Sequence, residues 1–187
     1  MTARRARSGA VGWTPLVIDR MVRSVETGRL ERGLSARSEP PTEVKFFNNA
    51  ERHCAAALLD LLTGQDGDEA FAVPVLEMID ARLAAGETDG WRYDDMPEDA
   101  QAWRDTLSYL DADAAGRCGT TFAEAPEADQ RELVQAVQDL KSGSWHGLPA
   151  DHVWSLWTRY ACTAFYAHPF AWNEIGFPGP AYPRSPQ

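Results

Sequence analysis

Histidine and cysteine are the side chains in this sequence best suited to acid–base or nucleophilic chemistry. The four histidines share no spacing typical of metal ligands: His53, His146, His152 and His168. His152 and Arg159 nevertheless fall on one line of a predicted helix, where they could perform acid–base work. Cys162 lies near His168 and could form a thiolate pair with it. A stand-alone enzyme that uses these residues is therefore one hypothesis.

Other sequence patterns of catalytic and metal sites are missing from this sequence. It contains no GxGxxG, Walker or GxSxG motif, and its three cysteines form no CxxC pair. The acidic stretch at 87–99 lacks the spacing of oxygen ligands that a calcium-binding loop needs. We expect no catalytic, cofactor-binding or metal-binding residue in this chain, and we expect Cys54, Cys118 and Cys162 to be small buried side chains.

Helical periodicity dominates the chain between Asn48 and Ala167. Apolar residues recur at helical spacing, with cap residues and glycines at the ends, in five stretches: 50–64, 73–86, 97–118, 125–140 and 149–167. In the fourth stretch, Leu133, Val137 and Leu140 are expected to face inward. Because no segment alternates convincingly with period two, we predict an all-α fold. This is a single compact bundle of about five to six helices with an ordered C-terminal tail rich in proline and aromatic residues.

Charge divides the chain into two parts. Residues 1–45 carry nine Arg or Lys against five Asp or Glu, whereas residues 46–187 carry nine against twenty-three. We predict a basic N-terminal helix and linker at 1–45 and a helical domain with its tail at 46–187. The acidic domain argues against nucleic-acid binding, because phosphate backbones would be repelled. No run approaches the ~20 apolar residues of a membrane span, which indicates a soluble protein.

The N-terminus superficially resembles an export signal. Arg4-Arg5 precedes an apolar patch at 9–18, but this patch is short, contains Pro15 and is followed at once by charged residues. No A-x-A cleavage site follows. We expect a cytoplasmic protein, with export together with a partner as the alternative.

The last predicted helix, 149–167, is apolar around most of its circumference. Only a narrow line is polar: His152, Ser155, Arg159 and Thr163. A helix of this kind is buried on most sides. It should be the central element, either of this domain alone or of this domain together with a partner.

The tail that follows Tyr166 combines five prolines with five large apolar or aromatic side chains: Phe170, Trp172, Ile175, Phe177 and Tyr182. A dispensable tail is usually polar. These side chains should therefore be buried. They could pack either against the chain's own core or against the surface of another protein.

Four stretches of this sequence resemble those of a known family, among them VPVLEMIDARL, which is similar to the family's second helix. The other three are FFNNAERHCAAALLDLL near the start of the domain, LSYLDADAAGRCGTTFAEAPEADQRELVQAV in the middle, and FYAHPFAWNEIGFPGPAYP at the end. The chain resembles the gluconate 2-dehydrogenase subunit 3 family over about residues 46–183. That resemblance implies an accessory subunit with no cofactor of its own. It also implies a large GMC-type partner that holds FAD and the catalytic histidine, and a cytochrome c or other acceptor for the electrons.

The resulting prediction is a non-catalytic small subunit that docks with, stabilises or matures a FAD-dependent sugar or polyol dehydrogenase. Besides the stand-alone enzyme, a free helical adaptor is a further alternative. The candidate interface residues lie on the last helix and in the tail: Trp154, Trp157, Tyr160, Tyr166, His168, Pro169, Phe170, Trp172, Asn173, Glu174, Phe177 and Tyr182.

Overall fold

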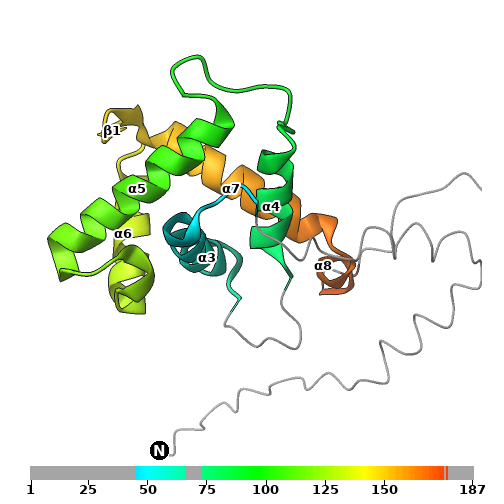
Figure 1. The fold of residues 1–187 in the computed structure, drawn as a ribbon, viewed down its shortest axis with the longest axis horizontal. Helices are drawn as coiled ribbons and strands as arrows, with labels where there is room; N and C mark the ends of the chain where they lie inside the picture. The colour runs from blue at the N-terminus through cyan, green and yellow to red at the C-terminus, as the bar shows by residue number, and fades with distance from the viewer. Residues whose placement is uncertain (1–44, 66–72, 175, 177–187) are drawn as a thin grey trace, which may run out of the picture. The chain divides into compact units, whose positions relative to one another are not determined.

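A computed structural model describes residues 45–65, 73–174 and 176 of the chain. The predicted basic helix and linker lie outside the described residues apart from Lys45, and the tail after Gly176 also lies outside them. The elements in chain order are α3 (Asn49–Thr63), α4 (Val75–Ala84), α5 (Asp99–Cys118), a 3-10 turn η1 (Phe122–Glu124), α6 (Glu127–Asp139), β1 (Ser144–Trp145), β2 (Leu148–Pro149), α7 (Ala150–Ala167) and α8 (Pro169–Glu174) (Figure 1). Six α-helices therefore make up most of the described part, which confirms the all-α prediction.

The first described helix begins and ends where its sequence predicts. The Asn48 side chain accepts a hydrogen bond from the amide of Glu51, and the Glu51 side chain accepts one from the amide of Asn48. This capping box satisfies two amides that have no partner within the helix. Gly64 ends α3 in the left-handed conformation, with φ of 67°, which glycine adopts without steric cost.

Helix α7 is the central element of the described domain. It packs against α3, α4, α5 and α6, and it crosses the middle of the view in Figure 1. One face places Val153, Leu156, Trp157 and Tyr160 in the core, where each is buried. The Trp157 indole donates a hydrogen bond of 3.1 Å to the hydroxyl of Thr106 on α5, so its one polar atom is satisfied inside the core. The prediction of a mostly buried last helix is confirmed.

The buried face of α6 differs from the one expected from the sequence. Leu140 does not face inward as predicted: it is 43% exposed, because α6 ends at Asp139 and Leu140 is already its C-terminal cap residue. The buried face of α6 is instead formed by Gln130, Val134 and Val137. Gln130 is accommodated there because its amide nitrogen donates to the carbonyl of Phe122 at 2.8 Å.

The segment 141–149, which joins the fourth and fifth predicted helices, contains a small β-hairpin. Ser144 pairs with Pro149 and Trp145 with Leu148, in antiparallel orientation. The two turn residues, His146 and Gly147, have positive φ values of 48° and 87°. Two consecutive residues with positive φ form the turn that best matches the twist of paired strands. Strands of two residues are too short to give a sequence pattern of period two.

A buried carboxylate fastens the start of the domain to α4. Asp80 is fully buried and accepts hydrogen bonds from the amides of Lys45, Phe46 and Phe47, at 2.6, 2.9 and 2.8 Å respectively. Three amide donors offset the cost of burying the negative charge. This contact fixes the direction in which the chain enters α3.

Candidate interaction site

A cluster of ion pairs joins α4, α5 and α7 to the connection between α4 and α5. The Arg159 Nε of α7 lies 2.9 Å from Asp89 Oδ2, and its Nη2 donates to Asp99 Oδ2 over 3.4 Å. Arg82 of α4 donates to the other oxygen of Asp89 at 2.7 Å. Two arginines therefore balance two carboxylates in a largely buried position, a requirement for burying charge at modest cost.

Tyr160 completes this cluster from inside the core. Its hydroxyl donates a hydrogen bond of 2.7 Å to Asp99 Oδ2. Burial raises the pKa of Tyr160 well above its usual value, and the hydrogen bond to Asp99 and the charges of Asp99 and Asp89 raise it further. Tyr160 is therefore a stable proton donor to Asp99 and is poorly suited to act as a base.

Aromatic side chains cover the outer side of the cluster. The guanidinium of Arg159 lies over the Trp91 ring, 4.5 Å from its centroid, and Trp91 meets Tyr93 edge to face at 5.3 Å. Tyr93 stacks on His152 with ring centroids 3.6 Å apart, and His152 Nδ1 lies 2.8 Å from Asp95. Three residues of the polar line predicted on the last helix, His152, Ser155 and Arg159, thus face the connection between α4 and α5. From the sequence this connection was considered only as an acidic stretch without the spacing of a calcium-binding loop, and Trp91 and Tyr93 were missed.

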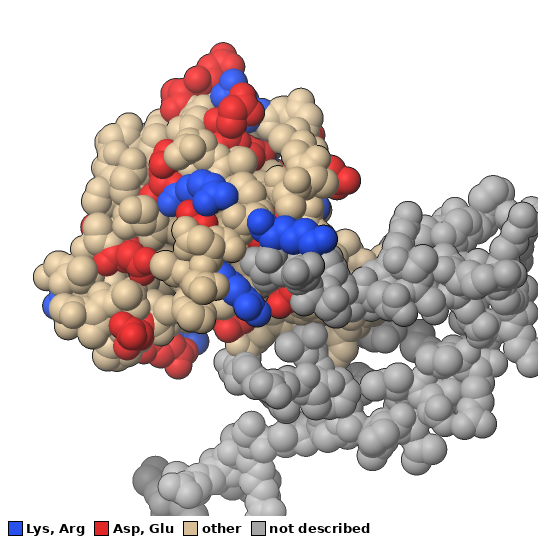
Figure 2. Space-filling view, in the orientation of Figure 1, with Lys and Arg blue, Asp and Glu red and all other residues tan. Residues whose placement is uncertain are grey.

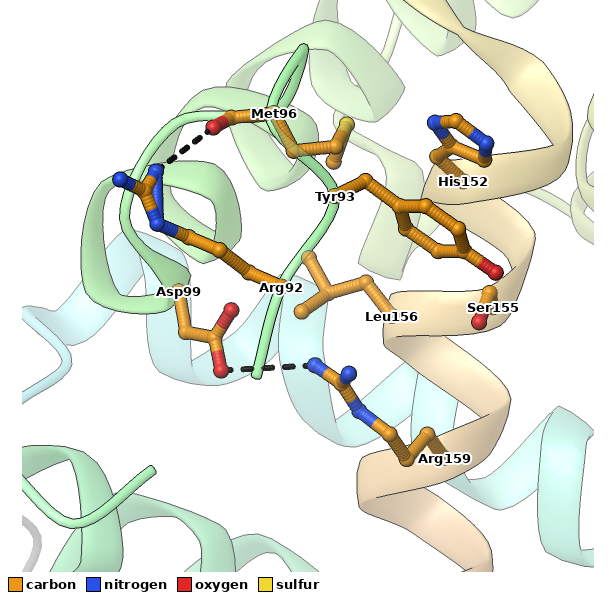
Figure 3. Close-up of a pocket in the computed structure, with 8 residues that line it drawn as sticks. All are labelled: Arg92, Tyr93, Met96, Asp99, His152, Ser155, Leu156 and Arg159. Atoms are coloured by element: carbon orange, nitrogen blue, oxygen red, sulfur yellow. Dashed lines mark hydrogen bonds and ion pairs between the residues drawn. The ribbon is translucent and has the colours of Figure 1, made fainter. Parts of the chain in front are cut away.

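A shallow pocket lies between this connection and α7 (Figure 3). Figure 3 shows Tyr93 against His152 and the Arg159 side chain directed toward Asp99. The pocket has room for about one water molecule. It cannot accommodate a sugar or a flavin ring. Arg159 and His152, which a stand-alone enzyme would use, are instead each held by carboxylates.

The three cysteines lie in different environments, and the expectation that all are buried is wrong for two of them. Cys54 is buried beside the carbonyl of Leu107, and burial raises its pKa far above the usual thiol value, with a further contribution from Asp111. Cys118 is half-buried and Cys162 is exposed. No hydrogen bond joins Cys162 to His168 in the part of the chain that the structure describes, and no cluster of metal-ligating side chains forms among those residues.

The end of α7 and the start of α8 form a surface that we name the C-terminal surface. It consists of Tyr166, His168, Pro169, Phe170 and Trp172, all half-buried or exposed. Tyr166 is 49% exposed, and its carbonyl accepts a hydrogen bond of 2.5 Å from the Trp172 indole. This bond fixes the aromatic side chain of α8 to the last turn of α7.

His168 shapes the turn between these two helices. Its Nδ1 accepts a hydrogen bond from the amide of Phe170 at 3.3 Å, as a cap of α8. Burial lowers the pKa of His168, which favours the neutral ring that this acceptor role requires. The neutral histidine therefore supports the position of Phe170 and Trp172.

The structure divides the predicted interface residues into four groups. Trp157 and Tyr160 are fully buried in the domain and cannot contact a partner directly. Trp154 is half-buried on α7 and packs against the core. The side chains of Asn173 and Glu174, together with Phe177 and Tyr182, lie outside the described residues. The remaining candidates are those of the C-terminal surface.

Comparison with protein families shows the family to which this chain belongs. The profile of gluconate 2-dehydrogenase subunit 3 matches residues 49–179, which span α3 through α8. The chain belongs to the gluconate 2-dehydrogenase subunit 3 family. Comparisons with curated proteins and with solved structures gave no match. In this subunit 3 protein, none of the helices that the structure describes combines the length and apolar character needed to cross a bilayer.

Proposed function

We propose that this chain is a non-catalytic small subunit that docks with a large FAD-dependent sugar or polyol dehydrogenase and stabilises it. The observation that carries this proposal is the C-terminal surface, which lies within the region matched by the family. The flavin and the catalytic groups would belong to the large subunit, which would pass its electrons to a cytochrome c or another acceptor.

Helix α8 is held in a way that suits a docking element. Ala171 is fully buried and Phe170 packs against the core, so α8 is fastened to the domain from one side. Tyr166 remains about half exposed and Trp172 is half-buried beside it. Aromatic side chains fixed before binding lose little conformational entropy when a partner covers them.

Burial of the exposed surface of Tyr166 and Trp172 by a partner would stabilise the complex. Full burial of a large apolar side chain stabilises a complex by roughly 1.5–3 kcal/mol. Tryptophan and tyrosine are also the residues most often found as energetic centres of protein interfaces. Removing the Trp172 side chain should therefore weaken docking by about 2 kcal/mol.

The test is purification of the affinity-tagged chain from its native host, followed by an absorption spectrum for flavin and haem. We expect a flavoprotein to co-purify in a fixed ratio with the chain. Recovery of the chain alone as a monodisperse protein would contradict the proposal and favour a free adaptor. Oxidation of polyols by the isolated chain would favour the stand-alone enzyme.

A further inference from the structure

A second exposed aromatic surface lies beside the first part of the central helix α7, where it contacts His152 and Arg159. Trp91 is 50% exposed and Tyr93 is 37% exposed, and both lie in the connection between α4 and α5. We name residues 87–95 the aromatic–acidic loop. Large aromatic side chains at this level of exposure in a loop are typical of binding surfaces when the loop is held in one conformation.

The contacts beneath the loop hold its aromatic side chains in place. Arg159 is fixed between Asp89 and Asp99, and Trp91 lies on its guanidinium. Tyr93 is held by stacking on His152. Each exposed ring is thus supported from below by a residue of α7, which leaves the opposite side of the ring for a partner.

The charge of the loop indicates what kind of surface would cover it. Residues 87–95 contain four acidic residues and one basic residue, Arg92, which pairs with Glu98 at 3.0 Å. Glu87, Asp94 and Asp95 are exposed. Figure 2 shows acidic side chains gathered where this loop projects from the domain. A basic surface with arginine or lysine side chains would meet both the carboxylates and the aromatic rings favourably.

We propose that the aromatic–acidic loop is a second docking element, which binds a basic patch on the large flavoprotein subunit. This inference rests on the proposed function and adds a contact distinct from the C-terminal surface. On α7, Arg159 supports Trp91 and His152 supports Tyr93, and they lie seven and fourteen residues before Tyr166, which corresponds to about 10 and 21 Å along the helix. Two contacts at this separation would fix the orientation of the small subunit as well as its affinity.

The experiment measures binding of the purified flavoprotein subunit to immobilised chain at low and high salt. One variant, Trp91→Ala, removes the aromatic contact, and Trp91→Tyr restores an aromatic ring. A second variant, Glu87→Gln with Asp94→Asn, removes two charges from the loop. The control, Glu127→Gln with Asp139→Asn, removes two charges from α6, which lies far from the loop in Figure 1. Circular dichroism and thermal unfolding confirm that each variant is folded.

We expect Trp91→Ala to weaken binding at least tenfold, chiefly through faster dissociation, and Trp91→Tyr to recover most of the loss. The loop charge variant should associate several-fold more slowly and show a weaker salt dependence, while the α6 control matches the wild type. Wild-type affinity and salt dependence in all loop variants would overturn this inference and leave the proposed function intact. If the flavoprotein does not bind the wild-type chain, both proposals fail.

Discussion

Tyr160 and Asp99, 61 residues apart in the sequence, are joined by a buried hydrogen bond of 2.7 Å. Asp99 is the first residue of α5 and is 5% exposed, whereas Tyr160 lies in the middle of α7 and is fully buried. The same carboxylate also forms an ion pair with Arg159, the residue that precedes Tyr160 on α7. This pair therefore connects the core of the domain with the ion pairs that support the aromatic–acidic loop.

The first prediction concerns the ion-pair cluster. Arg159→Met keeps much of the side-chain volume but leaves Asp89 and Asp99 with one positive partner fewer in a largely buried position. We expect the free energy of unfolding to fall by about 3 kcal/mol, because a buried charge is left uncompensated. Urea denaturation measures this change. The matched control is Arg117→Met, which breaks exposed ion pairs with Asp129 and Glu132 and should change stability far less.

The second prediction separates core tryptophans from surface tryptophans. Trp157→Ala should lower the free energy of unfolding by about 3–5 kcal/mol, since it empties a fully buried position and leaves the hydroxyl of Thr106 without its donor. Trp172→Ala should lower the free energy of unfolding by less, because Trp172 is half-buried on α8, a helix of only six residues. Thermal or urea unfolding of both variants checks the order. Equal losses would show that α8 is part of the core.

The third prediction concerns the fastening of the domain's first residues. Asp80→Ala removes the acceptor of three backbone amides, at Lys45, Phe46 and Phe47. We expect the free energy of unfolding to fall by about 3 kcal/mol and amide exchange at 45–47 to become faster, because charged acceptors form strong hydrogen bonds. Asp139→Ala on α6, whose carboxylate is exposed, is the control and should leave both quantities nearly unchanged. Unaltered exchange at 45–47 in Asp80→Ala would contradict this role.

The fourth prediction is a pH dependence at the turn between α7 and α8. Burial lowers the pKa of His168 in the folded protein, so the unfolded chain binds more protons than the folded chain as the pH falls below about 6.5. The stabilisation of α8 should therefore be present at neutral pH and decrease on acidification. His168→Asn keeps a side-chain acceptor for the amide of Phe170 and should remove this dependence.

Nuclear magnetic resonance provides the measurement for this turn. The amide signal of Phe170 should shift in the wild type as the pH is lowered through the weakly acidic range, and it should not follow the same titration in His168→Asn. A wild-type signal that stays constant over that range would show that His168 does not control the cap.

The helices of this domain were predictable because the residues that determine each helix lie close together in the sequence. Asn48 and Gly64 mark the ends of α3 by chemistry that acts within one turn. Trp103, Leu107 and Leu110 recur at helical spacing on α5, and all three are buried as expected. The failure at Leu140 lies at a helix end, where a shift of one residue decides whether a side chain still faces the core.

The candidate sites were less predictable because they depend on residues distant in sequence. In the sequence, Arg159 is one charged residue on the polar line of a helix. No residue near it in the chain reveals that it pairs with Asp89, seventy residues earlier. Trp91 and Tyr93 follow Gly90 in a polar stretch, and only the fold shows that α7 supports both rings. Trp157 and Tyr160 were included among interface residues because a helix apolar on most sides does not reveal which side a partner would cover.

Docking through the C-terminal surface is the central role proposed for this chain. Hydrogen exchange monitored by mass spectrometry, on the chain alone and in equimolar mixture with the co-purified flavoprotein, tests it most directly. We predict that binding slows exchange in the segment from Tyr166 to Trp172, with a second protected segment around Trp91, while α6 is unaffected. Unchanged exchange from Tyr166 to Trp172 in a complex that demonstrably forms would contradict the proposed docking surface.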